Sequence, residues 1–165
     1  MLRPSVLALL LVPLAGCPAP AEVEPPEGPV VGPIADGGEP SDPSPEFVAA
    51  RERWTEADLG AYSMTLQRIC FCPTPDYTGP FEVAVRDGAI ETVMLEGASV
   101  DVERGETVEA LFDLIAEAYE RGAESIAVDY DPEWGYPTSV GIDYSAQMAD
   151  EEIAYRVSDL RALDR

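Results

Sequence analysis

The sequence contains no histidine, no lysine and only three cysteines among its 165 residues. Without histidine it lacks the commonest general base and the commonest transition-metal ligand, which excludes histidine-dependent catalytic triads and histidine-ligated zinc sites. Basic residues are also few, since ten arginines face 32 acidic residues and the net charge is -22. Such a field repels phosphate backbones and anionic lipid head groups, so we expect no nucleic-acid partner.

Long hydrophobic runs are also missing, apart from one near the N-terminus. The apolar run Val6–Leu14 is shorter than the roughly 20 residues that a membrane-spanning helix needs. It follows the positive charge of Arg3 and precedes the small residues Ala15 and Gly16. This order is typical of a signal peptide, and we expect residues 1–16 to be removed from the mature protein.

The residues around the expected cleavage point resemble a known signal. Leu14-Ala15-Gly16-Cys17 is similar to the bacterial lipobox, and an ordinary secretory signal is the alternative. The lipobox resemblance implies that Cys17 is acylated, with palmitate-type chains that anchor the protein stably in a lipid membrane. Pro18 after this cysteine is compatible, by analogy with lipoprotein sorting, with the outer membrane. We therefore expect a lipid-anchored cell-envelope protein whose domain lies in the periplasm or at the cell surface.

The segment from Cys17 to residue 46 is expected to be a disordered tether. It carries nine prolines between Pro18 and Glu46, several acidic residues and no aromatic residue, so it has too little apolar surface to fold. Residues 47–165 are long enough for one domain with a single core and too short for two.

Hydrophobic periodicity within residues 47–165 predicts an α+β fold. An amphipathic pattern over 107–121, with Thr107 as a cap and Gly122 as a stop, predicts the main helix, and 47–59 predicts a shorter N-terminal helix. Alternating segments predict strands over 62–71, 81–86, 90–95, 125–130, 138–144 and 153–160. Helices and strands do not alternate strictly, so we expect an antiparallel sheet of about five to six strands with both helices packed on one face.

Cys70 and Cys72 are the two thiols left if Cys17 is acylated. In an oxidising compartment such neighbours tend to pair, although two residues of an extended strand this close need a backbone kink to do so. The alternatives to a structural disulfide are free thiols, a redox role, or soft-metal binding, for which a single CxC is a weak signal.

Several acidic residues gather near the predicted ends of the last strands. Carboxylates on loops are the ligands that calcium prefers, which makes Asp129, Asp131, Asp143 and Asp150 weak candidates for a calcium site. No EF-hand spacing is present, and a solvated acidic edge is the simpler interpretation. The sequence indicates no firm metal site and no other cofactor.

The chain resembles bacterial lipoproteins that carry the domain of unknown function number 6174. The resemblance covers roughly residues 62–161 and rests on four motifs in a fixed order: YSMTLQRICFCPTPDYTGPFEVAVRDG, TVEALFDLIAEA, YDPEWGYPTSVGIDY and ADEEIAYRVSDL. It implies a secreted or lipid-anchored protein and no particular activity.

No catalytic constellation is visible, so we expect a membrane-anchored module that binds a ligand or has a structural role and is not an enzyme. The alternatives are a calcium-responsive module that uses the acidic loops and a redox role for the CxC pair. The ligand, the protein partner and the oligomeric state do not follow from the sequence.

Overall fold

The computed structural model describes residues 38–70, 75–145 and 152–164. The elements in chain order are α1 (Pro45–Ala57), β1 (Ala61–Ile69), η1 (Pro75–Tyr77), β2 (Phe81–Arg86), β3 (Ala89–Leu95), β4 (Ala98–Ser99), η2 (Val102–Arg104), α2 (Val108–Glu120), β5 (Ser125–Tyr130), β6 (Pro137–Asp143) and β7 (Glu152–Ala162).

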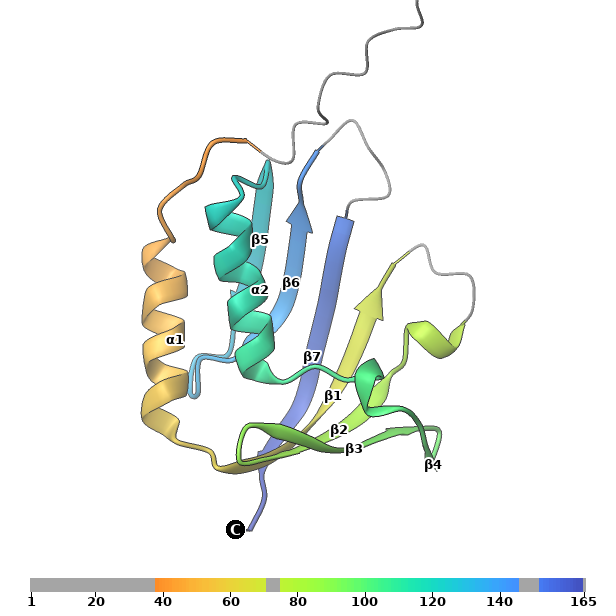
Figure 1. Ribbon diagram of the computed structural model, residues 1–165. Helices are drawn as coiled ribbons and strands as arrows, with labels where there is room; N and C mark the ends of the chain where they lie inside the picture. The colour runs from red at the N-terminus through yellow and green to blue at the C-terminus, as the bar shows by residue number, and fades with distance from the viewer. Residues whose placement is uncertain (1–37, 71–74, 146–151, 165) are drawn as a thin grey trace, which may run out of the picture. The chain divides into compact units, whose positions relative to one another are not determined.

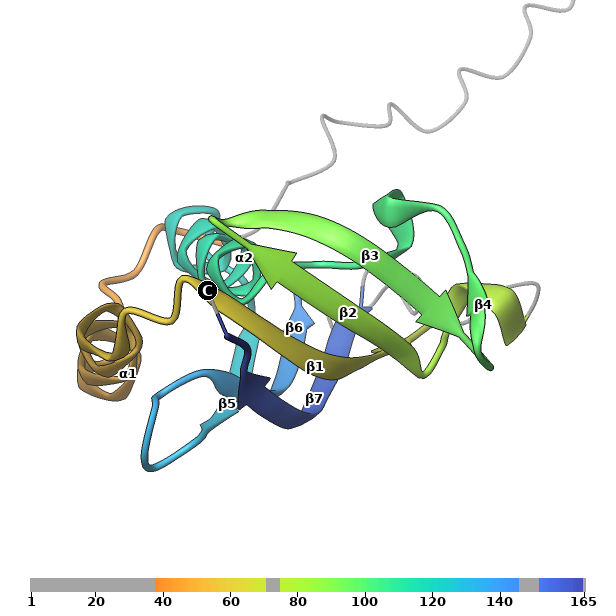
Figure 2. The same cartoon turned by 90° about the horizontal axis from the view of Figure 1, so that it is seen from below.

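The seven strands form one antiparallel sheet in the order β4-β3-β2-β1-β7-β6-β5. Each half of the sheet is a meander, and the first long strand pairs with the last one through a register that sets Arg68 opposite Tyr155. Figure 2 shows β1, β2 and β3 side by side, with the short β4 at the outer edge. The β1–β7 pairing therefore joins the two halves of the sheet.

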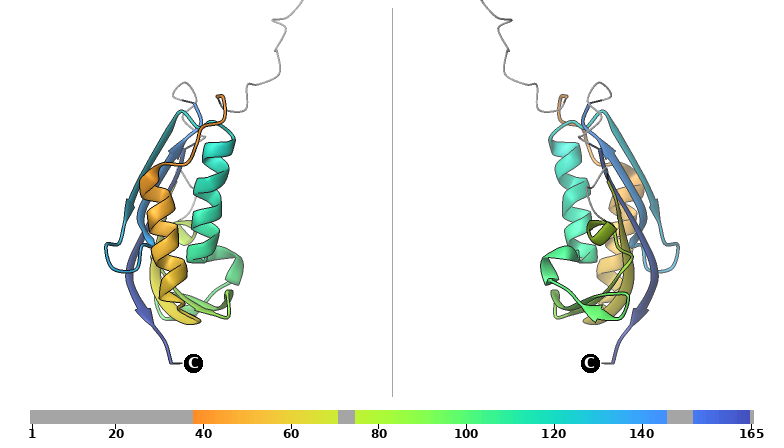
Figure 3. Two further views of the ribbon diagram at one scale, coloured as in Figure 1. Left: turned by 90° about the vertical axis from the view of Figure 1, so that its left-hand side faces the viewer. Right: turned by 90° about the vertical axis from the view of Figure 1, so that its right-hand side faces the viewer.

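Both helices lie on the same face of the sheet (Figures 1 and 3). Phe47 of α1 meets Phe112 of α2 edge-on at 5.9 Å between ring centroids, and Phe112 stacks on Tyr130 of β5. The buried side chains of the strands alternate along the chain, as the burial of Tyr62, Met64 and Leu66 in β1 illustrates. The core therefore fills the space between the two helices and this face.

The opposite face of the sheet carries mostly small and polar side chains; Ile69 of β1, which pairs with Ala154 and is 47% exposed, is an exception. One row across the sheet consists of Ala127, Gly141 and Ala154, which are paired in register on β5, β6 and β7. No helix of the described residues lies over this face in Figure 3, so the antiparallel sheet has one packed face and one open face.

The predicted architecture was wrong in two respects. The sheet has seven strands and dominates the fold, whereas we predicted five to six. The extra strand, β4, has only two residues, which is too short for any alternation to be visible. The N-terminal helix is also not the shorter one, because α1 and α2 have 13 residues each.

The helix ends explain the second error. Ser44 accepts a hydrogen bond from the Phe47 backbone N–H at 3.1 Å, so α1 begins at Pro45, where a proline suits the first helical turn. Thr107 caps α2 as predicted, with its hydroxyl 3.0 Å from the Ala110 N–H, and the cap itself stands outside the helix. The N-terminal helix is thus shifted two residues towards the N-terminus with its expected length, and the two helices are equally long because α2 is shorter than the predicted range 107–121.

The last part of the predicted tether contacts α2. The Gly38 N–H donates to the Gly122 carbonyl at 2.6 Å, and the Ser41 N–H donates to the Tyr119 carbonyl at 3.0 Å. Residues 38–44 therefore lead into α1 along the C-terminal end of α2.

Candidate functional site

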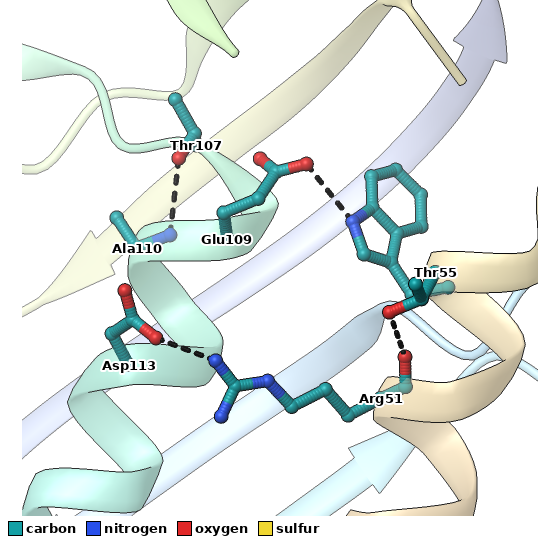
Figure 4. Close-up of polar contacts among 7 residues, drawn as sticks. Arg51, Thr55, Thr107, Glu109, Ala110 and Asp113 are labelled. Carbon is teal, nitrogen blue, oxygen red and sulfur yellow. Dashed lines mark hydrogen bonds and ion pairs between the residues drawn. The ribbon is translucent and has the colours of Figure 1, made fainter. Parts of the chain in front are cut away.

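A hydrogen-bond network joins the N-terminal end of α2 to β1 and α1. The Tyr62 hydroxyl donates to a carboxylate oxygen of Glu109 at 2.9 Å and accepts from the Val108 N–H at 2.9 Å. The other Glu109 oxygen accepts from the Trp54 indole N–H at 3.0 Å (Figure 4). Burial raises the pKa of the Tyr62 hydroxyl far above its usual range, so the hydroxyl stays protonated and able to donate.

This network is structural in character. Each of its polar groups has a partner, and Tyr62 is 1% exposed, so no ligand can approach the hydroxyl without unfolding part of the core. An exposed ion pair between Arg51 and Asp113, 2.8 Å apart, connects the same two helices further along (Figure 4). Together these contacts fix α2 in position over the sheet.

A cleft runs beside α2 on the side of β7. Its cavity has a volume of about 330 Å³, near the lower end of the range for small-molecule sites. Its lining residues come from the segment before α2, from α2 itself and from β7: Glu106, Ala110, Leu111, Asp113, Leu114, Glu117 and Tyr155. All the charged groups in this lining are carboxylates, and the other side chains are aliphatic or aromatic.

Glu106 is the least exposed of the three acids in the lining. Its side chain is 34% exposed, and its carboxylate lies 3.5 Å from the Arg68 guanidinium, which is longer than a strong charge-assisted hydrogen bond. The Arg68 side chain of β1 is held against Tyr155 of β7, because its Nε donates to the Tyr155 hydroxyl at 3.3 Å and its guanidinium lies over the Tyr155 ring. Burial raises the pKa of Glu106 even though the attraction of Arg68 opposes this. The cost of burying the charged carboxylate therefore exceeds the stabilisation that it gains from Arg68.

Asp113 and Glu117 form the outer part of the cleft. Each has an arginine partner, at 2.8 Å for Asp113 with Arg51 and 3.4 Å for Glu117 with Arg121, and both carboxylates are more than half exposed. Exposed pairs of this kind contribute little binding energy of their own, so these arginines can yield to another cation at small cost.

Cys70 directly follows β1 and is disulfide-bonded. Its predicted partner, Cys72, lies outside the described residues, and so does Cys17. The Cys70–Cys72 pairing and the acylation of Cys17 therefore stay predictions.

Of the four calcium candidates the structure describes three, and it holds Asp129 and Asp143 apart. Asp129 pairs with Ser139 and Asp143 pairs with Ser125, so the two aspartates stand four residues apart on the β5–β6 hairpin, about 13 Å along the strands. Asp131 caps the turn between these strands by accepting from the Glu133 and Trp134 N–H groups at 3.0 and 2.8 Å.

Asp150, the fourth calcium candidate, lies outside the described residues. Among the residues that the structure describes, no group of three acidic or cysteine side chains could hold a metal ion.

The described part of the chain also contains no helix that is long and apolar enough to cross a membrane.

Sequence reasoning missed the cleft, although one signal was present. Glu106, Ala110, Asp113 and Glu117 recur every three or four residues, which places polar and small side chains on one side of the predicted helix. What no local pattern shows is that Tyr155, some 40 positions later, faces this side of the helix.

A protein-family model matches residues 46–162, and its description is a family of unknown function (DUF6174). No curated protein and no solved structure matches the chain.

Proposed function

Since the chain belongs to DUF6174, a family of unknown function, we propose its function from its own chemistry: it is a lipid-anchored binding module of the bacterial cell envelope. The binding site is the cleft beside α2, and the module has no catalytic activity. The observation that carries the proposal is a cavity of about 330 Å³ in which three carboxylates, two leucines and a tyrosine converge.

The anchor rests on the sequence. A short apolar segment, the lipobox-like Leu14-Ala15-Gly16-Cys17 and a proline-rich stretch before α1 support acylation at Cys17 and attachment to the outer membrane. A tether of this composition keeps the domain away from the bilayer, so that the cleft is open to soluble ligands.

Two experiments test the two halves of this proposal separately. For the anchor, the full chain and its Cys17→Ala variant are expressed in a Gram-negative bacterium with labelled palmitate and then fractionated. We expect label and membrane association for the full chain only. Equal label in the variant would show that Cys17 is not the acylated residue.

For the cleft, native mass spectrometry is applied to the lipidated chain extracted from those membranes in mild detergent. We expect a small molecule bound to the unaltered chain and lost from Ala110→Leu, because the larger side chain fills the cavity without changing its charge. Retention of the molecule by this variant would place binding elsewhere and refute the cleft as the site.

A further inference from the structure

The segment that leads into α1 is docked by its backbone on the C-terminal end of α2. Two of its N–H groups donate to carbonyls there, Gly38 to Gly122 at 2.6 Å and Ser41 to Tyr119 at 3.0 Å. The last carbonyls of a helix have no partner within the helix, so this segment supplies a cap from outside. We call residues 38–44 the strap, which is the orange segment before α1 in Figure 1 and belongs to the same compact unit as α2.

Two glycines make the contact between the strap and the helix end. A Cβ added to Gly38 would lie 2.9 Å from the Gly122 carbonyl oxygen, and a Cβ added to Gly122 would lie 2.4 Å from the Glu39 carbonyl oxygen. Both distances are shorter than a Cβ can adopt, so the backbones approach this closely because neither position has a side chain. Gly122 also has a φ of +65°, which suits the residue that follows a helix. The strap is therefore fitted to this helix end.

The contacts that hold the strap are few and weak. Residues 38–43 are exposed, so little apolar burial contributes, and Pro40 and Pro43 have no N–H group to donate. One backbone hydrogen bond shifts an equilibrium by only about two- to tenfold. Glu39 also brings a carboxylate to the end of the helix at which the macrodipole disfavours negative charge. We therefore expect the strap to open locally, without unfolding of the sheet.

We propose that the strap is a releasable connection between the tether and the folded domain. The docked strap caps α2 and fixes the point at which the chain enters the domain. Release adds seven residues to the tether, about 22 Å in an extended form, and removes two hydrogen-bond donors from the end of α2.

A pull on the tether acts first on these two hydrogen bonds, so the tether lengthens before the load reaches the sheet. The docking does not depend on the lipid anchor, whereas the effect on reach rests on the anchor of the proposed function.

Hydrogen–deuterium exchange, read at single amides by mass spectrometry, tests the strap in the full chain extracted in mild detergent. We expect the Gly38 and Ser41 amides to exchange about 5- to 100-fold more slowly than in a free chain, the range for two backbone hydrogen bonds. They should still exchange at least about tenfold faster than amides in the middle of β1, which open only with the whole domain.

Gly38→Ala tests whether the close backbone contact holds the strap. Its Cβ does not fit against the Gly122 carbonyl, and Gly38 is not among the positive-φ glycines, so the variant adds no strain of its own. The Ser41 amide should exchange at the free-chain rate. The Gly122 and Ala123 amides should exchange at least about twofold faster, because the end of α2 loses its external cap, and those of β1 should not change.

The matched control is Gly141→Ala on β6. Gly141 is also outside the positive-φ region, and the nearest atom to its added Cβ is at an ordinary 3.7 Å. This variant should leave the exchange of the strap amides unchanged.

Four results would overturn the inference. Free-chain exchange of Gly38 and Ser41 in the unaltered chain would show that the strap is not docked, and exchange as slow as that of β1 would show that it is not released. Unchanged Gly122 and Ala123 amides in Gly38→Ala would show that release does not reach α2. Equally fast strap exchange in Gly141→Ala would indicate general destabilisation. The palmitate experiment tests the anchor separately, so its failure would remove only the effect on reach.

Discussion

Replacement of Tyr62 by phenylalanine tests how strongly the buried network holds α2 to the sheet. The change removes a hydrogen bond to the Glu109 carboxylate, worth about 1.5–3 kcal/mol, and leaves the Val108 N–H without its acceptor, at a cost of about 1–3 kcal/mol. Both contacts share one hydroxyl and do not add fully. We expect the free energy of unfolding to fall by about 3 kcal/mol, which lowers the melting temperature by roughly 10 °C.

The assay is urea unfolding at pH 7, followed by tryptophan fluorescence, since Trp54 contacts the Tyr62 ring at 5.2 Å. Tyr136→Phe is the matched control: Tyr136 is also buried and also contacts Trp54, but its hydroxyl has no hydrogen-bond partner among the described residues. The control should lose less than about 1 kcal/mol.

A double-mutant cycle with Glu109→Gln assigns the energy to the pair. We expect a coupling energy of about 1 kcal/mol or more, because the tyrosine and the carboxylate are in direct contact. If Tyr62→Phe costs no more than Tyr136→Phe, or if the coupling is zero, the network is not what fixes α2.

Three further predictions concern other contacts. Gly135 has a φ of +81° and an added Cβ would lie against the Ala50 carbonyl, so Gly135→Ala should lower the free energy of unfolding in urea by at least about 2 kcal/mol. The control Gly88→Ala, at a φ of +75° in open space, should lower it by about 1 kcal/mol. Equal losses in the two variants would contradict the close approach of α1 to Gly135. Arg51→Ala should cost less than about 1 kcal/mol, because its ion pair is exposed. Burial raises the folded-state pKa of Glu106 above its ordinary value of 4.5, so its contribution to stability is complete below that value and is lost as the pH rises through the folded pKa. Between pH 4 and 8 the urea midpoint should therefore fall less steeply with rising pH in Glu106→Gln than in the unaltered chain. An equal slope in the two proteins would show that the pKa of this carboxyl is not raised.

Local patterns predicted most of the elements because each pattern has a local cause. The alternation that starts at Tyr62 marks β1, and the Asp87-Gly88 pair forms the β2–β3 turn with both residues at positive φ. Thr107 is the cap of α2 because its hydroxyl can reach an N–H group of the first turn. The two-residue β4 had no such signal, since its pairing with β3 depends on the neighbouring strand.

The candidate site was much less predictable than the elements. Acidic residues are so frequent in this sequence that their presence alone selects nothing, and the aspartates chosen as calcium candidates include two at opposite ends of one hairpin. Glu106 and Tyr155, which face the cleft, belong to segments with no sequence relation to each other.

By itself the sequence determined most of the helical and strand segments, the helix cap and the acidic charge of the protein, because periodicity, capping and ionisation depend on residues close together in the chain. Tertiary structure alone decided that β1 pairs with β7 and that α2 lies beside this seam. Burial of apolar side chains drives this long-range pairing, which brings Arg68 against Tyr155 and leaves the cleft next to α2.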